Sequence, residues 1–214
     1  MDNENLMNML YDILHALAAL ATVWFFVACY FAWRKIDWST EEEIKTEYKD
    51  IDLYKQLHLQ KSNYGTSGKQ YVNWFKGFLK DHKGIKTILD FGCGKGELAK
   101  GLSLDIDEYD PAIEGKTTIP KKQYDLVITT DVLEHIHSDQ IKLLLYDIIE
   151  LQPKYLVNAI NTVEAINILP DDTNAHKTIE NANWWKNTIE QYTGYKTKIF
   201  METKDTCILC SYKD

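Results

Sequence analysis

The chain has 214 residues, of which 45% are hydrophobic and 12% are aromatic. This length and composition suit one globular domain with an appendage, because two full domains usually need a longer chain. The formal net charge is −8 and Arg34 is the single arginine, whereas a surface that follows nucleic-acid phosphates needs an excess of basic residues. We therefore do not expect nucleic acid to be the main partner.

An uncharged apolar run near the N-terminus differs from the rest of the chain. Residues 16–33 carry no charge over 18 positions, and a helix of that length measures about 27 Å, close to the thickness of a bilayer core. A buried core helix and a cleavable signal peptide are the alternatives. A signal peptide should begin with positive charge, but this run follows acidic residues and ends before Arg34 and Lys35. The pattern predicts a retained transmembrane helix over residues 13–35, after a tail of residues 1–12.

The basic residues near this predicted helix set its expected orientation. None precedes it, while Arg34, Lys35, Lys45 and Lys49 follow it. By the positive-inside rule, the N-terminus should lie outside and the larger C-terminal part in the cytoplasm. The acidic stretch over residues 39–52 then indicates a linker or solvated helix within residues 36–62.

The main domain is expected over residues 63–214. It should open with an amphipathic helix whose apolar residues recur at helical spacing, with Thr66 or Ser67 as the N-cap and Gly84 at the end. Strands and helices then alternate. Strands are expected over residues 87–91, toward Tyr109, and over 124–130, 155–160, 196–201 and 206–212, and helices over 97–102, 141–151 and 183–193.

This alternation predicts an α/β fold with a mostly parallel sheet, helices on its faces, and a closing antiparallel strand. Cys207 and Cys210 lie three positions apart on the last expected strand, so their side chains should point to opposite faces. We therefore expect free thiols, suited to a reducing compartment, and no structural metal at this pair.

A glycine loop follows the first expected strand. Gly92, Gly94 and Gly96 lie where this strand turns into a helix, at the sheet edge where open α/β folds bind ligands. Glycine lets the backbone approach a ligand and adopt positive φ. The loop reads G-x-G-x-G, whereas a dinucleotide site favours G-x-G-x-x-G. Asp110 lies 18 residues after Gly92, where a carboxylate can accept bonds from both ribose hydroxyls, so an adenosine-type cofactor is expected.

Three segments in order, "ILDFGCGKG", "YDP" and "YDLVITTDVLEHI", resemble the class I S-adenosylmethionine-dependent methyltransferases over residues 64–212. More narrowly, "YG" at positions 64–65, "YDPAI", "DVLEHI" and "LPDDTNAHKTI" with a later "WW" are similar to a methyltransferase-like group found in bacteria and bacteriophages. The resemblance implies a Rossmann-like sheet and S-adenosylmethionine as cofactor. It implies cofactor contacts from Tyr64, Gly65, Asp90, Phe91, Gly92, Cys93, Gly94, Gly96, Asp110, Pro111, Thr130 and Asp131.

Within that set the resemblance gives roles to four places. The glycine loop would hold the methionine portion of the cofactor, with Asp90 near its amino group. Asp110 would bind the ribose, and Thr130 and Asp131 would line the pocket between cofactor and acceptor.

One part of the chain departs from the family pattern. Only 13 residues separate Pro111 from Asp125, too few for the usual helix, third strand and adenine-binding loop. The sheet should therefore be trimmed at one edge. Ile113 is then a candidate for apolar contact with the adenine.

Candidate catalytic residues are His135, His176 and Asp131, because a positioned base helps when the methyl acceptor is a hydroxyl or an amine. Structural alternatives stand beside them. Glu134 and His135 can simply fix a loop through hydrogen bonds, and the segment around His176 can serve only to gate the substrate. "WW" at positions 184–185 favours a core and lid role over a stacking platform.

The expected function is that of a membrane-anchored S-adenosylmethionine-dependent methyltransferase with an unidentified, envelope- or lipid-linked acceptor. Asp131, Glu134, His135 and His176 are also similar to the metal site of small-RNA 2′-O-methyltransferases, which gives a metal-dependent RNA enzyme as one alternative. A catalytically silent, membrane-tethered binding module and a nicotinamide-dependent oxidoreductase are the others. The main interpretation assigns no resident metal, and the Lys-, Asn- and Ile-rich composition suggests a bacterial or bacteriophage source.

Overall fold

The computed structural model describes residues 48–213, and the predicted transmembrane helix over residues 13–35 lies outside them. Across residues 48–213, no helix combines the length and the apolar character needed to cross a bilayer. The membrane helix and its orientation therefore stay predictions.

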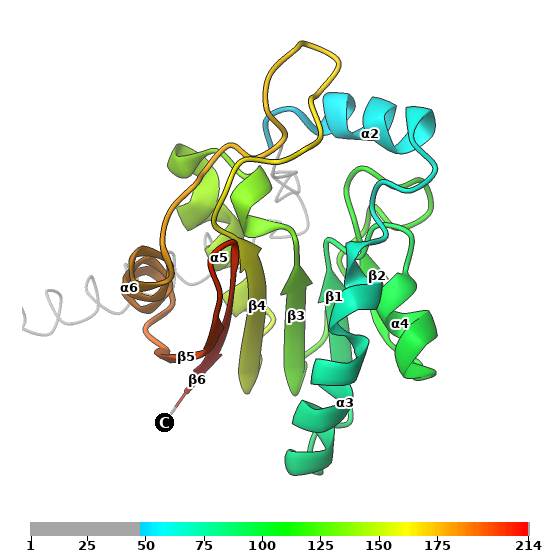
Figure 1. The fold of residues 1–214 in the computed structure, drawn as a ribbon. Helices are drawn as coiled ribbons and strands as arrows, with labels where there is room; N and C mark the ends of the chain where they lie inside the picture. Colours follow the sequence, from blue (N-terminus) through cyan, green and yellow to red (C-terminus); the bar gives the residue numbers. More distant parts are fainter. Residues whose placement is uncertain (1–47, 214) are drawn as a thin grey trace, which may run out of the picture. The chain divides into compact units, whose positions relative to one another are not determined.

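Six strands form one sheet in the described part of the chain, in the order β2-β1-β3-β4-β6-β5 (Figure 1). The pairs among β2, β1, β3 and β4 are parallel, whereas β6 runs antiparallel to both β4 and β5. The strands are β1 Ile88–Phe91, β2 Asp107–Tyr109, β3 Leu126–Thr130, β4 Tyr155–Asn161, β5 Lys196–Glu202 and β6 Thr206–Tyr212. The expected α/β fold with a mostly parallel sheet is confirmed.

Helices cover both faces of this sheet. The α-helices are α2 Ile51–Gln60, α3 Val72–Asp81, α4 Glu97–Leu102, α5 Ile141–Glu150 and α6 Ala182–Thr193. Apolar residues of α3 and α4 pack with Leu126 and Ile128 of β3. Apolar residues of α5 and α6 pack with Val127, the strand residue between those two. Successive strand residues point to opposite faces, so a continuous apolar run can serve two helix layers.

The last strand confirms the expectation for its two cysteines. Cys207 packs with the helix layer of α5 and α6, and Cys210 packs with the layer of α3 and α4. Both thiols are free and buried. The two sulfur atoms therefore face different layers and cannot share one metal ion.

The sheet is trimmed at one edge, as the spacing after Pro111 predicts. Residues 110–125, all of them described, contain no helix and no strand, and β2 forms that edge of the sheet. This stretch is too short to build a crossover helix and a further parallel strand.

The opening helix of the domain differs from its expected form. A 3₁₀ turn over Ser67–Tyr71 precedes α3, and α3 ends at Asp81, before Gly84. Neither Thr66 nor Ser67 caps it, because the Thr66 hydroxyl donates to the Asn63 carbonyl and the α3 N-cap has no side-chain bond. The expected cap is therefore wrong.

Helix α2 packs on the domain, within the segment expected as linker or helix. Tyr54 and Leu57 are buried on its inner side, where they contact Leu169 and Ala175 of the segment between β4 and α6. Both segments lie at the edge toward which the parallel strands point (Figure 1). This contact places α2 over the edge where open α/β folds bind ligands.

Candidate functional site

A cavity opens at the carboxyl ends of β1, β2 and β3, with about 710 Å³ of empty space including its open mouth. Helix α2 supplies one wall, and the loops after the three strands supply the floor. The lining residues are Lys49, Ile51, Tyr54, His58, Tyr64, Gly65, Ser67, Gly68, Gly92, Cys93, Gly94, Asp110, Pro111, Ala112, Thr130, Asp131, Val132, His135 and Ile136.

The cavity brings together most residues that the sequence assigns to the cofactor. Tyr64, Gly65, Gly92, Cys93, Gly94, Asp110, Pro111, Thr130 and Asp131 line it, together with the catalytic candidate His135. Asp90, Phe91, Gly96, Ile113 and His176 are not among its lining residues. Phe91 packs in the core and Gly96 forms the N-cap of α4. The binding roles of all these residues stay predictions.

The glycine loop has the backbone form that the sequence predicts. Gly92, Gly94 and Gly96 all have positive φ. A Cβ on Gly94, however, would meet the Gly65 carbonyl oxygen at 2.5 Å, and the Lys95 N–H donates to that oxygen at 2.8 Å. Glycine is therefore required at position 94 by a close backbone contact within the protein.

Asp110 directly follows the strand β2, and its carboxylate is anchored. One oxygen accepts a hydrogen bond from the Gly94 N–H at 2.8 Å, and the other accepts from the Ala112 N–H at 2.8 Å. Each oxygen of an ionised carboxylate has two lone pairs, so both can still accept another bond. The side chain is thus held in place and can accept from a pair of hydroxyls.

Asp90 lies beneath the glycine loop and is only 1% exposed. Neither of its carboxylate oxygens has a hydrogen-bond partner among the described residues. Burial, followed by the negative charges of Glu108 and Asp110, raises the pKa of Asp90 to about 7. A buried carboxyl without a donor is costly. This orphaned group fits a cationic ligand such as the α-amino group of S-adenosylmethionine.

His58 of α2 is a cavity residue that the sequence reasoning did not assign. Its Nδ1 is buried without a hydrogen-bond partner, and burial lowers its pKa below the usual value. A Cβ on Gly65 would lie 2.2 Å from the His58 ring. Gly65 therefore packs against α2 on one side and against Gly94 of the glycine loop on the other. The apolar spacing of Tyr54 and Leu57 was the available signal that α2 packs inward.

Asp131, His135 and His176 converge beside the cavity. The Asp131 Oδ1 atom lies 3.6 Å from Nε2 of His135 and 3.8 Å from Nε2 of His176. Asp131 has a left-handed backbone with φ of 61°, and its Oδ1 accepts from the Asn161 side-chain amide at 2.5 Å. Burial alone would raise the pKa of Asp131, but its neighbours His135, His176 and Ser67 outweigh burial and lower the pKa strongly. Asp131 is thus ionised.

Glu134 has the loop-fixing role that the sequence offers as an alternative. It is fully buried, and one carboxyl oxygen accepts from the Asn161 N–H at 2.5 Å. Its main-chain carbonyl accepts from the N–H groups of Lys177 and Thr178. Burial, followed by the Asp131 charge, raises the pKa of Glu134 well above its usual value, so Glu134 is neutral.

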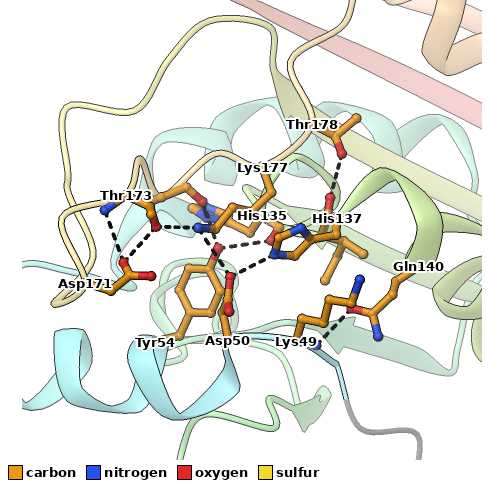
Figure 2. Close-up of polar contacts among 12 residues, drawn as sticks. Lys49, Asp50, Tyr54, His135, His137, Gln140, Asp171, Thr173, Lys177 and Thr178 are labelled. Atoms are coloured by element: carbon orange, nitrogen blue, oxygen red, sulfur yellow. Dashed lines mark hydrogen bonds and ion pairs between the residues drawn. The ribbon is translucent and has the colours of Figure 1, made fainter.

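Several contacts hold α2 and the segment around residue 175 over this cluster (Figure 2). The Tyr54 hydroxyl lies 3.0 Å from the His135 carbonyl oxygen and 2.8 Å from the Ala175 carbonyl oxygen. Asp50 lies 2.8 Å from Nε2 of His137 and 3.3 Å from the Lys177 ammonium. These contacts tie together three parts of the chain that are far apart in sequence.

Comparisons with known proteins agree with this geometry. Residues 68–149 match a family described as a methyltransferase domain. A SAM-dependent methyltransferase from Archaeoglobus fulgidus has a similar fold, with 17% identity, a TM-score of 0.51, and coverage of 73% of this chain and 99% of that one. No curated protein gives a match to the chain.

Two further solved structures share the fold. Magnesium protoporphyrin IX methyltransferase from Synechocystis, with bound SAH, has 15% identity and a TM-score of 0.52 over 68% of this chain and 83% of that one. DhpI in complex with SAH has 12% identity and a TM-score of 0.51 over 75% of this chain and 95% of that one. At these identities the likeness concerns the fold.

The described residues therefore form a Rossmann-like domain of the class I methyltransferase type. Residues 68–149 match a methyltransferase-domain family, and the described residues share their fold with S-adenosylmethionine-dependent methyltransferases, which agrees with the expected superfamily, enzyme class and cofactor.

Replacing Asp90 should change how stability depends on pH. A pKa raised from 3.8 to about 7 means that the unfolded chain loses this proton first, so stability falls as pH rises through that window. Asp90→Asn removes this loss. From pH 5 to pH 8, the free energy of unfolding of the natural protein should fall by about 2–3 kcal/mol relative to that of the variant.

Urea denaturation of the ligand-free proteins at both pH values measures this difference. Asp105→Asn, an exposed residue before β2, is the matched control and should follow the natural protein. A difference between Asp90→Asn and the natural protein that does not change with pH would contradict a protonated Asp90.

Proposed function

We propose that the domain transfers the methyl group of S-adenosylmethionine to an acceptor bound beside Asp131, His135 and His176. The observation that carries this proposal is the orphaned Asp90 carboxyl beneath the glycine loop, on the strand that pairs with β2, after which the anchored Asp110 carboxylate follows. Together they offer one anionic contact for an amino group and one for a ribose.

The cofactor would lie in the cavity over the glycine loop, beneath which Asp90 is buried, and would extend to Asp110. Asp110 would accept hydrogen bonds from the ribose hydroxyls. His58 of α2 lies near Asp110, since the Asp110 charge opposes the lowering of the His58 pKa by burial. Gly65 and Gly94 leave no space for side chains between them, so the bound molecule would lie against bare backbone.

The bound cofactor supplies an already activated methyl group, so the protein mainly aligns the acceptor and excludes water. Thr130 ends β3, Asp131 follows it, and both line the cavity, which supports a position for them on the acceptor side. Helix α2, held through Tyr54, covers the cavity from solvent. The two Nε2 atoms, beside the ionised Asp131 carboxylate, offer acceptors for the proton of a hydroxyl or amine.

We also propose that the chain is anchored in a membrane through residues 13–35, with the N-terminus outside and the catalytic domain in the cytoplasm. The uncharged run over residues 16–33 and the basic residues after it support this arrangement. Anchoring favours an acceptor that is itself linked to the envelope or to lipid.

Asp110→Asn should weaken cofactor binding. The amide group that replaces one carboxylate oxygen cannot accept a hydrogen bond, and a charge-assisted bond contributes roughly 1.5–3 kcal/mol. Calorimetry should show a loss of affinity for S-adenosylmethionine of about tenfold or more. Asp105→Asn makes the same change at an exposed position and should bind normally. Normal binding by a folded Asp110→Asn protein would contradict the ribose assignment.

His135→Gln and His176→Gln should lower methyl transfer by about 10²–10⁴-fold while cofactor affinity stays nearly unchanged. The acceptor is first found by incubating the protein with fractionated bacterial extracts and methyl-labelled cofactor. His82→Gln is the matched control, because its Nδ1 also bonds a main-chain carbonyl, that of Phe78, away from the cavity. Full activity of both site variants would leave catalysis to alignment alone.

Full-length protein should sediment with membranes after cell lysis and stay there through a high-salt wash. A chain that starts at Thr46 should remain in the supernatant and still bind S-adenosylmethionine, because the residues lining the cavity all follow that position. Recovery of full-length protein in the soluble fraction would contradict the anchor and leave the enzyme assignment intact.

A further inference from the structure

Two histidine rings beside the cavity have a tautomer that their surroundings define. Nδ1 of His135 lies 2.8 Å from the Ala175 carbonyl oxygen, and Nδ1 of His176 lies 2.6 Å from the Val163 carbonyl oxygen. A carbonyl oxygen only accepts, so each Nδ1 must carry the donated proton. In the neutral rings, Nε2 therefore presents a lone pair.

Both Nε2 atoms face the same carboxylate. Nε2 of His135 and Nε2 of His176 lie 3.6 and 3.8 Å from Oδ1 of Asp131. These distances are too long for hydrogen bonds. When both rings are neutral, three electron-rich atoms surround one small space, an arrangement that a cation between them stabilises.

We propose that Asp131, His135 and His176 bind one divalent transition-metal ion. Their ligand atoms all lie within 4.8 Å of one another. Ligand atoms around a tetrahedral ion with bonds of about 2.1 Å are roughly 3.4 Å apart. The two distances to Asp131 are within a few tenths of an ångström of this value, and the two imidazoles approach each other through small side-chain movements.

The surroundings of the three ligands match those of metal sites. Metal-bound histidines usually donate their other ring N–H to a carbonyl or carboxylate, as His135 and His176 do here. Asn161 holds the Asp131 carboxylate by its side-chain amide. Glu134 is fully buried next to Asp131, and its Oε2 has no hydrogen-bond partner among the described residues. This orphaned oxygen is an independent sign that the cluster lacks a binding partner.

The donor set decides which ions fit. Two imidazoles and one carboxylate favour Zn²⁺, Mn²⁺, Fe²⁺ or Co²⁺ over Mg²⁺ and Ca²⁺, which prefer oxygen ligands throughout. Three protein ligands leave an open coordination position, and Asp131 and His135 both line the cavity. An oxygen of the methyl acceptor can occupy that position, where the ion would lower the pKa of the acceptor in place of proton transfer to the two Nε2 atoms. This last role rests on the proposed function, whereas binding of the ion does not.

Metal binding is testable on the full-length chain without an acceptor. The protein is stripped with chelator, dialysed against Zn²⁺ or Mn²⁺, and its bound metal is counted by mass spectrometry, with electron paramagnetic resonance for Mn²⁺. We expect one ion per chain and a higher melting temperature in its presence. His135→Gln and His176→Gln should each reduce the affinity by about 100-fold or more.

His82→Gln is the control for the loss of a histidine outside the cluster, and it should bind metal normally. Cofactor calorimetry on every variant shows whether the fold is kept. Absence of a stoichiometric ion in the natural protein, or normal binding by a folded His176→Gln, overturns the metal site. In either case normal binding of S-adenosylmethionine would leave the proposed function standing.

Discussion

The Tyr54 hydroxyl is the contact on which the arrangement of the site depends. It joins α2 to the main-chain carbonyls of His135 and Ala175, which belong to segments 40 residues apart in the sequence. The neighbouring residue His176 reaches Asp131 only because this segment is held in place. This buried contact, together with the N–H groups of Lys177 and Thr178 that donate to the Glu134 carbonyl, holds the cover of the cavity and the geometry of the Asp131 cluster.

Burial and neighbouring groups shift the pKa values of the carboxyl groups at the site in different directions. Asp90 and Glu134 are both buried, and low exposure together with neighbouring negative charge raises the pKa of each. Asp131 stays ionised because histidine and hydroxyl groups surround it. Asp131 thus keeps its negative charge beside the cavity, whereas the charges of Asp90 and Glu134 depend on what binds.

The sequence predicts the sheet well because its signals are local. Apolar runs such as the one at β3 and the glycines after β1 carry their meaning within a few positions, and the structure places each close to the expected bounds. The shortened stretch after Pro111 likewise predicts the trimmed edge by length alone.

Contacts between segments that are distant in the sequence are harder to predict from local patterns. Gly94 is needed because Gly65 lies against it, and no local pattern indicates that the two approach each other. The His58 ring reaches the cavity through the packing of α2, which is visible in sequence only as weak amphipathic spacing. Of the three residues in the Asp131 cluster, His176 was the hardest to place, since loop closure rather than strand pairing brings it near.

The two edge strands of the sheet, β2 and β5, have features that hinder pairing with a strand of another molecule. At one end, β2 has three residues, and Asp107 and Glu108 engage Lys122 and Lys116 in ion pairs. At the other end, the register of β5 shifts between Ile199 and Met201, and exposed lysines lie along the strand. Short length, charge and a bulge each oppose the addition of a strand from another chain. A protein concentrated on a surface would thereby resist edge-to-edge aggregation.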